Sequence, residues 1–121
     1  MNPKILVADD SATMRGIICR QLRAVGCTDL YEASDGDDAL RYYEPGKFDL
    51  ILLDWNMPGK TGREVIEEIR ALDSDTVIFL VTTQAEKGRV MAAMQAGVTD
   101  YLVKPFTAET LREKMEKHGL Q

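Results

Sequence analysis

Residues Phe48–Leu53 read FDLILL and are followed directly by Asp54, so an apolar run ends in an acid. A short run that is apolar at nearly every position predicts a strand buried on both faces, which is typical of parallel sheets. A second run of this kind, VIFLV at Val77–Val81, predicts another buried strand. The two runs together favour a parallel sheet covered by helices on both sides.

The flanking segments alternate in the same way along the chain. Shorter strands are expected at Ile5–Ala8, Leu30–Ala33 and Tyr101–Val103. Helical spacing of apolar residues marks helices at Ala12–Val25, Asp37–Glu44, the segment carrying Val65, Ile66, Ile69 and Leu72, Lys87–Ala96 and Thr107–Lys117. Five strands alternating with five helices predict an α/β fold with a doubly wound, five-stranded parallel sheet.

Composition restricts the class of protein. The 121 residues are 45% hydrophobic and 29% charged, as in an ordinary globular protein, and we expect residues 1–121 to form a single domain. A net charge of −5 argues against a nucleic-acid partner, because phosphate contacts need a basic surface. Val77–Val81, the longest aliphatic or aromatic run, is too short to span a bilayer, so no membrane association is expected.

Two further observations bear on the compartment. Ile5–Ala8 is too short to be the core of a signal peptide. Cys19 and Cys27 lack the spacing of a zinc site or a disulfide framework. The sequence therefore predicts a reduced, cytoplasmic protein.

Polar residues follow the expected strands where each strand ends. Asp9 and Asp10 follow the first strand, Asp54 the third, Thr82 the fourth and Lys104 the fifth. Because ligands bind outside the carboxyl ends of strands in an open parallel sheet, these side chains are expected to meet at one edge. Taken singly, each has an ordinary structural role, such as an acid before a helix or a β-branched residue in a strand.

The combination indicates chemistry. Three carboxylates on one edge repel each other, and one lysine cannot neutralise them all. Mg²⁺, which prefers oxygen ligands, would bring the formal charge to zero. No glycine-rich phosphate loop is present, and His118, the only histidine, is expected to be solvated in a frayed C-terminal region. Because aspartate is a nucleophile for phosphoryl groups, we interpret Asp54 as a phosphoryl acceptor.

Longer motifs give a family resemblance over nearly the whole chain. Asp9-Asp10 follows KILVA, and the other motifs are LILLDWNMPGKTG at 50–62, VIFLVTTQAE at 77–86 and YLVKPF at 101–106. Together they resemble the receiver domains of bacterial two-component response regulators. DWNMPG, AAMQAG and VKPFTAETL are most similar to the single-domain chemotaxis members. The resemblance implies a flavodoxin-like fold with strand order 2-1-3-4-5.

The resemblance also implies ligands and partners. Asp54 would take a phosphoryl group from a histidine kinase. Mg²⁺, with Mn²⁺ as a substitute, would be bound by Asp10, Asp54 and the backbone carbonyl of Asn56, with Asp9 acting through water. Expected output partners are a flagellar motor switch protein and a phosphatase.

Further residues gain a role from the same resemblance. Lys104 and Thr82 would contact phosphoryl oxygens, and Tyr101 would be an aromatic switch that turns inward with Thr82. The Lys104–Pro105 bond is expected to be cis. The output surface would comprise the Lys87–Ala96 helix, the strand at Tyr101 and the last helix.

Three positions depart from the family pattern. Thr83 stands where alanine or glycine is usual, and Gln84 replaces the usual glutamate. Asp100 adds a charge to the expected docking surface. Asn56 and Gln84 are both expected to bear on hydrolysis of the acyl phosphate, so the resemblance sets no phosphate lifetime.

Several functions remain open at this level. The leading one is a phosphorylation switch that is not an enzyme and has no output domain of its own. A phosphorelay shuttle or a receiver excised from a larger regulator fits the same motifs. A Mg²⁺-dependent phosphohydrolase with an aspartyl nucleophile is disfavoured, because its acids are separated by one residue whereas Asp9 and Asp10 are adjacent. Those two acids would also repel the phosphate of a flavin.

Overall fold

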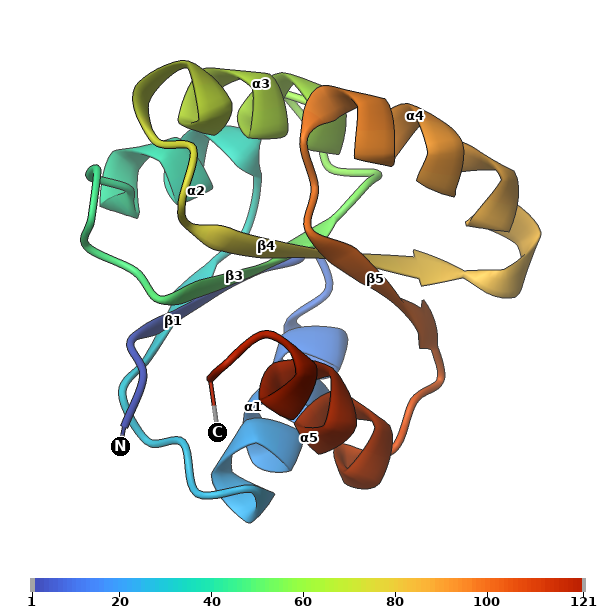
Figure 1. Ribbon diagram of the computed structural model, residues 1–121. Coiled ribbons are helices and arrows are strands. Elements are labelled where there is room, and N and C mark those ends of the chain that lie inside the picture. The colour runs from blue at the N-terminus through green and yellow to red at the C-terminus, as the bar shows by residue number, and fades with distance from the viewer. Residues whose placement is uncertain (1, 121) are drawn as a thin grey trace.

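A single parallel sheet organises the chain in the computed structural model, which describes residues 2–120. The strand order is β2-β1-β3-β4-β5, and every pairing is parallel (Figure 1). The strands are β1 (Ile5–Ala8), β2 (Leu30–Ala33), β3 (Leu50–Asp54), β4 (Val77–Thr83) and β5 (Asp100–Lys104). The predicted doubly wound sheet and its strand order are confirmed.

Helices cover both faces of this sheet. They are α1 (Ala12–Ala24), α2 (Gly36–Tyr42), α3 (Gly62–Leu72), α4 (Val90–Ala96) and α5 (Ala108–Lys117). Helices α2, α3 and α4 lie over one face, and α1 and α5 lie over the other (Figure 1). A 3₁₀ segment, η1 (Gln84–Arg89), joins β4 to α4. No helix within residues 2–120 is both long and apolar enough to cross a membrane.

The pleat of the strands creates two hydrophobic cores. Successive side chains of a strand point to opposite faces, and accordingly Leu53 packs in the core beneath α2, α3 and α4. Its neighbour Leu52 packs in the core against α1 and α5. Both are fully buried, as are Phe79 and Leu80 of β4. The prediction that β3 and β4 are buried on both faces is therefore confirmed.

Local signals explain where several helices begin and end. Ser11 caps α1 by accepting a hydrogen bond from the backbone N–H of Met14 at 3.2 Å. A reciprocal capping box between Thr61 and Glu64 starts α3. Gly97 ends α4 in the left-handed conformation, at φ 114°.

The region after β4 differs from the predicted boundaries. The strand expected at Val77–Val81 continues to Thr83, because β-branched threonines favour extended backbone. The helix expected from Lys87 starts only at Val90, and the preceding turn is 3₁₀. Gly88 lies within that turn, and glycine disfavours a regular α-helix. The other boundaries move by a few residues, with Asp54 becoming the last residue of β3.

The expectations for His118 and Asp100 are wrong. The His118 ring packs 5.5 Å from the ring of Phe79, and its Nε2 lies 2.9 Å from Asp100 Oδ2. Asp100 is only 7% exposed and also accepts a hydrogen bond from Lys114 Nζ at 2.8 Å. His118 is thus part of a packed contact between β5 and α5, and Asp100 presents no free charge to solvent.

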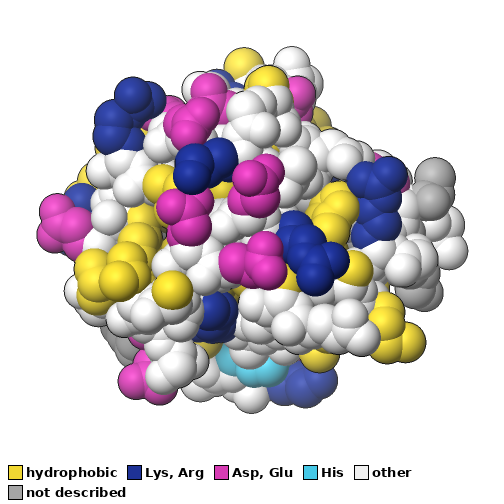
Figure 2. Space-filling model, turned by 90° about the horizontal axis from the view of Figure 1, so that it is seen from above, with side chains coloured by type: hydrophobic (Ala, Val, Ile, Leu, Met, Phe, Trp, Pro, Cys, Tyr) yellow, Lys and Arg dark blue, Asp and Glu magenta, His cyan; other side chains and the backbone are white. Residues whose placement is uncertain are grey.

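The outer surface of the helical layer formed by α2, α3 and α4 is mixed in character. Figure 2 shows acidic and basic side chains interspersed there with small hydrophobic patches. Met91 and Met94 of α4 are the most exposed large apolar side chains of that helix, at 71% and 49%. This polarity is what amphipathic helices require when their other side covers a sheet.

Candidate functional site

Three aspartates meet at the carboxyl edge of the sheet. Asp9 and Asp10 follow β1, and Asp54 ends β3. One carboxylate oxygen from each lies within 4.8 Å of the others. Asp9 and Asp54 are buried, at 1% and 7% exposed, whereas Asp10 is exposed. The structure thus brings together the three acids that the sequence placed at this edge.

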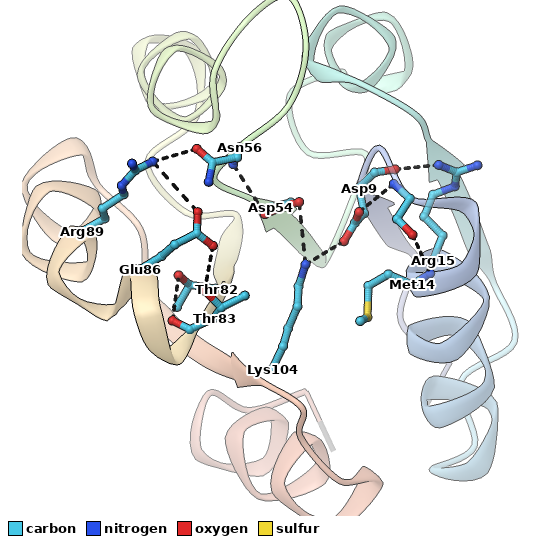
Figure 3. A network of polar contacts seen from close by, with 11 residues as sticks. Asp9, Met14, Arg15, Asp54, Asn56, Thr82, Thr83, Glu86, Arg89 and Lys104 are labelled. Carbon is cyan, nitrogen blue, oxygen red and sulfur yellow. Dashed lines mark hydrogen bonds and ion pairs between the residues drawn. The ribbon is translucent and has the colours of Figure 1, made fainter.

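Lys104 supplies the positive charge in this cluster. Its Nζ lies 3.1 Å from Asp9 Oδ2 and 3.7 Å from Asp54 Oδ2. Figure 3 shows the ammonium between the two carboxylates. Lys104 is the last residue of β5, and the following peptide bond to Pro105 is cis, as the resemblance implied.

Neighbouring residues fix Asp9 in place. Its Oδ1 accepts a hydrogen bond from the backbone N–H of Ser11 at 2.9 Å. Arg15 Nη1 donates to the backbone carbonyl of Asp9 at 2.6 Å, and Arg15 Nε pairs with Glu32 at 3.3 Å. Neither Ser11 nor Arg15 was predicted from the sequence. A serine directly before an apolar-periodic segment is a recognisable cap signal, whereas nothing in the sequence pattern marks Arg15.

The start of α3 packs closely against the backbone that carries Asp54. The N–H of Gly62 donates to the carbonyl of Trp55 at 2.9 Å. A Cβ at position 62 would lie 2.8 Å from the Cα of Trp55 and 2.9 Å from the backbone oxygen of Asp54. Only glycine fits this approach without displacing the end of β3.

Among the side chains that the structure describes, the charges in the cluster do not balance. Three carboxylates and one ammonium leave a formal charge of −2. Burial, together with repulsion from Asp9 and Asp10, raises the pKa of Asp54 to about 6, although Lys104 and the N–H of Asn56 oppose this rise. Clustered carboxylate oxygens with a deficit of two charges fit a hard divalent cation such as Mg²⁺.

Thr82 and Tyr101 lie in β4 and β5, and neither is hydrogen-bonded to the acids of the cluster in the described residues. Thr82 is fully buried, and its hydroxyl lies 3.5 Å from the carbonyl of Thr83. Tyr101 is half-buried, with Lys114 Nζ 4.9 Å from its ring centroid. Within residues 2–120, no hydrogen bond joins either residue to the three acids. Thr82 is the last but one residue of β4, and Tyr101 is the second residue of β5.

A second network of polar contacts borders Asp54 on the side of η1. Arg89 Nη1 donates to Asn56 Oδ1 at 2.7 Å and lies 4.0 Å from Glu86. Glu86 in turn accepts a hydrogen bond from the Thr83 hydroxyl at 2.9 Å (Figure 3). Glu86 and Arg89 were not predicted from the sequence, because a regular helix was expected from Lys87.

Comparison with known proteins identifies the family. The model of the response regulator receiver domain matches residues 5–116. The chain belongs to the response regulator receiver family. As a receiver domain it acts in phosphorylation-dependent signalling, as the sequence motifs predicted.

Curated relatives of this receiver domain include chemotaxis proteins. The chain is 46% identical over 116 residues to the chemotaxis protein CheY of Pseudomonas aeruginosa, covering 94% of each chain. It is 43% identical over 118 residues to CheY-3 of Vibrio cholerae, covering 96% of this chain and 91% of that protein.

Solved structures of receivers share the architecture. The chemotaxis response regulator CheY4 of Vibrio cholerae aligns with a TM-score of 0.85 and 32% identity, over 98% of this chain and 99% of that one. The receiver domain of a sensor histidine kinase from Pseudomonas aeruginosa aligns with a TM-score of 0.84 and 30% identity, over 97% of each chain. That structure holds a magnesium ion coordinated in its active-site cleft.

Proposed function

We propose that this receiver is a Mg²⁺-dependent switch in which Asp54 accepts a phosphoryl group from a histidine kinase. The observation that carries the proposal is the buried carboxylate of Asp54, which lies beside two further acids and has Lys104 as its only ion-pair partner among the side chains that the structure describes. A site left with excess negative charge is suited to an external cation, which in turn admits an anionic phosphoryl group.

The donor set suggests how the metal is held. Asp10, Asp54 and the backbone carbonyl of Asn56 would bind Mg²⁺ directly, and Asp9 would act through water. When bound, the ion supplies the positive charge that offsets the phosphoryl oxygens. Mn²⁺ is expected to substitute, because it also accepts oxygen ligands.

The protein's own side chains would supply the nucleophile and the contacts to the phosphoryl oxygens. As a carboxylate oxygen of Asp54 bonds to phosphorus, the phosphorus–nitrogen bond of the donor imidazole breaks. The imidazole nitrogen keeps the electron pair and takes up a proton. Lys104, now 3.7 Å from Asp54, would contact one phosphoryl oxygen, and the hydroxyl of Thr82 would contact another.

The output of the switch is proposed to be altered partner binding in chemotaxis. Thr82 would move toward the phosphoryl group and Tyr101 would turn inward, shifting a two-state equilibrium. The surface formed by α4, β5 and α5 would then bind a flagellar motor switch protein, and a phosphatase would end the signal. The chemotaxis proteins among the relatives support this role.

Intact mass spectrometry tests the central step. Incubation with acetyl phosphate and Mg²⁺ is expected to add roughly 80 Da, one phosphoryl group, to the full chain. The gain should vanish when metal is chelated and in Asp54→Asn. Glu116→Gln, which changes an exposed carboxylate on α5, is the matched control and should gain the same mass. An undiminished gain in Asp54→Asn would contradict the assignment of the acceptor.

A further inference from the structure

Arg89 is held between two elements that border the proposed acceptor. Its Nη1 donates to Asn56 Oδ1 at 2.7 Å, in the loop after β3. The same Nη1 lies 4.0 Å from Glu86 Oε2, and Glu86 is itself held by the hydroxyl of Thr83 at 2.9 Å. These contacts connect the end of β4 to the loop that follows Asp54 (Figure 3).

Asn56 lies beside the carboxylate that would carry the phosphoryl group. Its backbone N–H lies 3.4 Å from Asp54 Oδ1. The side chain of Asn56 therefore extends from a backbone position close to the bond that hydrolysis must break. The amide oxygen is the only acceptor on this side chain. In Figure 3 that oxygen is turned toward Arg89, so it is not presented to a water molecule at Asp54.

Hydrolysis of an aspartyl phosphate needs a well-placed water molecule. The water oxygen bonds to phosphorus while the bond between phosphorus and the Asp54 oxygen breaks. The electron pair of that bond returns to the carboxylate, and a proton leaves the water for the phosphate product or solvent. An acceptor beside the water orients it for attack and lowers the barrier.

We propose that Arg89 is a positioning residue that prolongs the phosphorylated state by holding the amide oxygen of Asn56 away from the hydrolytic water. This inference rests on the proposed role of Asp54. Arg89 does not touch the reacting atoms, and its effect requires the side chain of Asn56. The side chains of Thr83 and Glu86 keep Arg89 in the geometry that makes the contact.

The decisive measurement is the decay of the phosphorylated chain. The 121-residue chain is phosphorylated with acetyl phosphate and Mg²⁺. The donor is removed by rapid desalting, and the loss of roughly 80 Da is followed by intact mass spectrometry. Arg89→Met is expected to decay about three- to tenfold faster, the effect of one modest hydrogen bond on a barrier. An unchanged or slower decay would overturn the proposal.

A double-mutant cycle separates positioning from simple charge. In an Asn56→Ala background the amide oxygen is gone, so adding Arg89→Met should leave the decay rate unchanged. The same acceleration in both backgrounds would show that Arg89 acts through its charge alone and would overturn the role assigned to Asn56.

A matched control comes from α3. Arg63 pairs with Glu67 at 3.8 Å, and its side chain is 50% exposed, against 51% for Arg89. Arg63→Met therefore removes an equally exposed guanidinium whose ion pair is with Glu67 and not with Asn56 or the three acids, and its decay should equal that of the parent. An equal acceleration in Arg63→Met would overturn the inference.

The mass gain before decay distinguishes the two proposals. If the unmodified chain gains no mass, the proposed role of Asp54 fails. If the chain gains mass but decay in Arg89→Met is unaltered, only the role of Arg89 fails. Because phosphorylation requires a folded site, the initial gain also reports that each variant is folded. A parent that gains mass beside an Arg89→Met protein that does not would contradict a purely positioning role.

Discussion

Asp54 and Asp100 are equally buried, at 7% exposed each, but their pKa values shift in opposite directions. Asp54 ends β3, and burial raises its pKa to about 6. Asp100 begins β5, where burial also acts to raise its pKa, but hydrogen bonds from Lys114, His118 and the backbone outweigh burial and lower it to about 2. Burial alone therefore does not decide the state of a carboxylate in this fold.

The difference lies in the donors that each carboxylate has. Asp100 accepts hydrogen bonds from Lys114 Nζ at 2.8 Å, from the N–H of Tyr101 at 2.8 Å and from His118 Nε2 at 2.9 Å. Asp54 accepts one backbone hydrogen bond at 3.4 Å. Its other partner, Lys104 Nζ at 3.7 Å, also pairs with Asp9. A buried aspartate can thus be well supplied with donors in this fold, whereas the described side chains leave Asp54 short of the positive charge that a bound cation would supply.

The largest expected effect is at Asp100. Asp100→Ala should lower the free energy of unfolding by about 3 kcal/mol, because it leaves Lys114 and His118 without their buried partner. Urea denaturation at pH 7.5 measures this. Glu116→Gln, on the exposed side of α5, should change stability by less than about 0.5 kcal/mol. A loss no larger than that of the control would show that the Asp100 cluster is not stabilising.

Asp54→Asn should have the opposite sign. Ionising Asp54 costs more in the folded than in the unfolded chain, so without divalent metal the substitution should raise the free energy of unfolding by about 2 to 3 kcal/mol at pH 7.5. Between about pH 4 and 6 the folded chain binds the extra proton, so its stability should fall as pH rises through this window. Urea denaturation at both ends of the window should show the benefit of Asp54→Asn disappearing toward pH 4. A benefit independent of pH would contradict the charge explanation.

Mg²⁺ should remove part of this imbalance. At ten times its dissociation constant, a ligand that binds only the folded state stabilises it by about 1.4 kcal/mol. The unmodified chain and Glu116→Gln should both gain this amount in urea denaturation, and Asp54→Asn should gain less. Trp55, which follows Asp54 directly, provides a fluorescence signal for the same titration. Equal stabilisation of Asp54→Asn would place the ion elsewhere.

The smallest expected effect concerns His118. His118→Leu keeps an apolar group against Phe79 and removes one of the donors to Asp100, so it should cost about 1 kcal/mol. The loss should be clearly smaller than that of Asp100→Ala, because Lys114 remains paired. Thermal denaturation of the two variants side by side compares the two losses of stability. A larger loss in His118→Leu than in Asp100→Ala would mean that the imidazole is the main partner of Asp100.

The sequence was sufficient to predict the sheet and its acidic edge. Apolar runs such as Phe48–Leu53 are determined by burial on both faces, and that constraint acts along a continuous stretch of chain. The acids after β1 and β3 could be placed together because parallel strands end at the same edge. These features depend on periodicity and order, which a sequence displays directly.

Contacts between distant turns could not be read in this way. Arg89 meets Asn56 across 33 positions, from a 3₁₀ turn with no repeating apolar pattern. His118 was misplaced because its partners, Asp100 and Phe79, lie on strands, and only packing of α5 brings it to them. Such pairs are set by tertiary packing and leave no periodic signal in the chain.

The close packing of Gly62 against the end of β3 has a consequence for how this family's sequences are interpreted. Any side chain at this position would press on Trp55 and on the peptide oxygen of Asp54. In a saturation mutagenesis scan, Gly62 would therefore tolerate as little change as Asp54, the proposed phosphoryl acceptor, although glycine offers no functional group. A ranking of residues by intolerance would place it among the chemical residues, whereas what it preserves is the path of the backbone behind them.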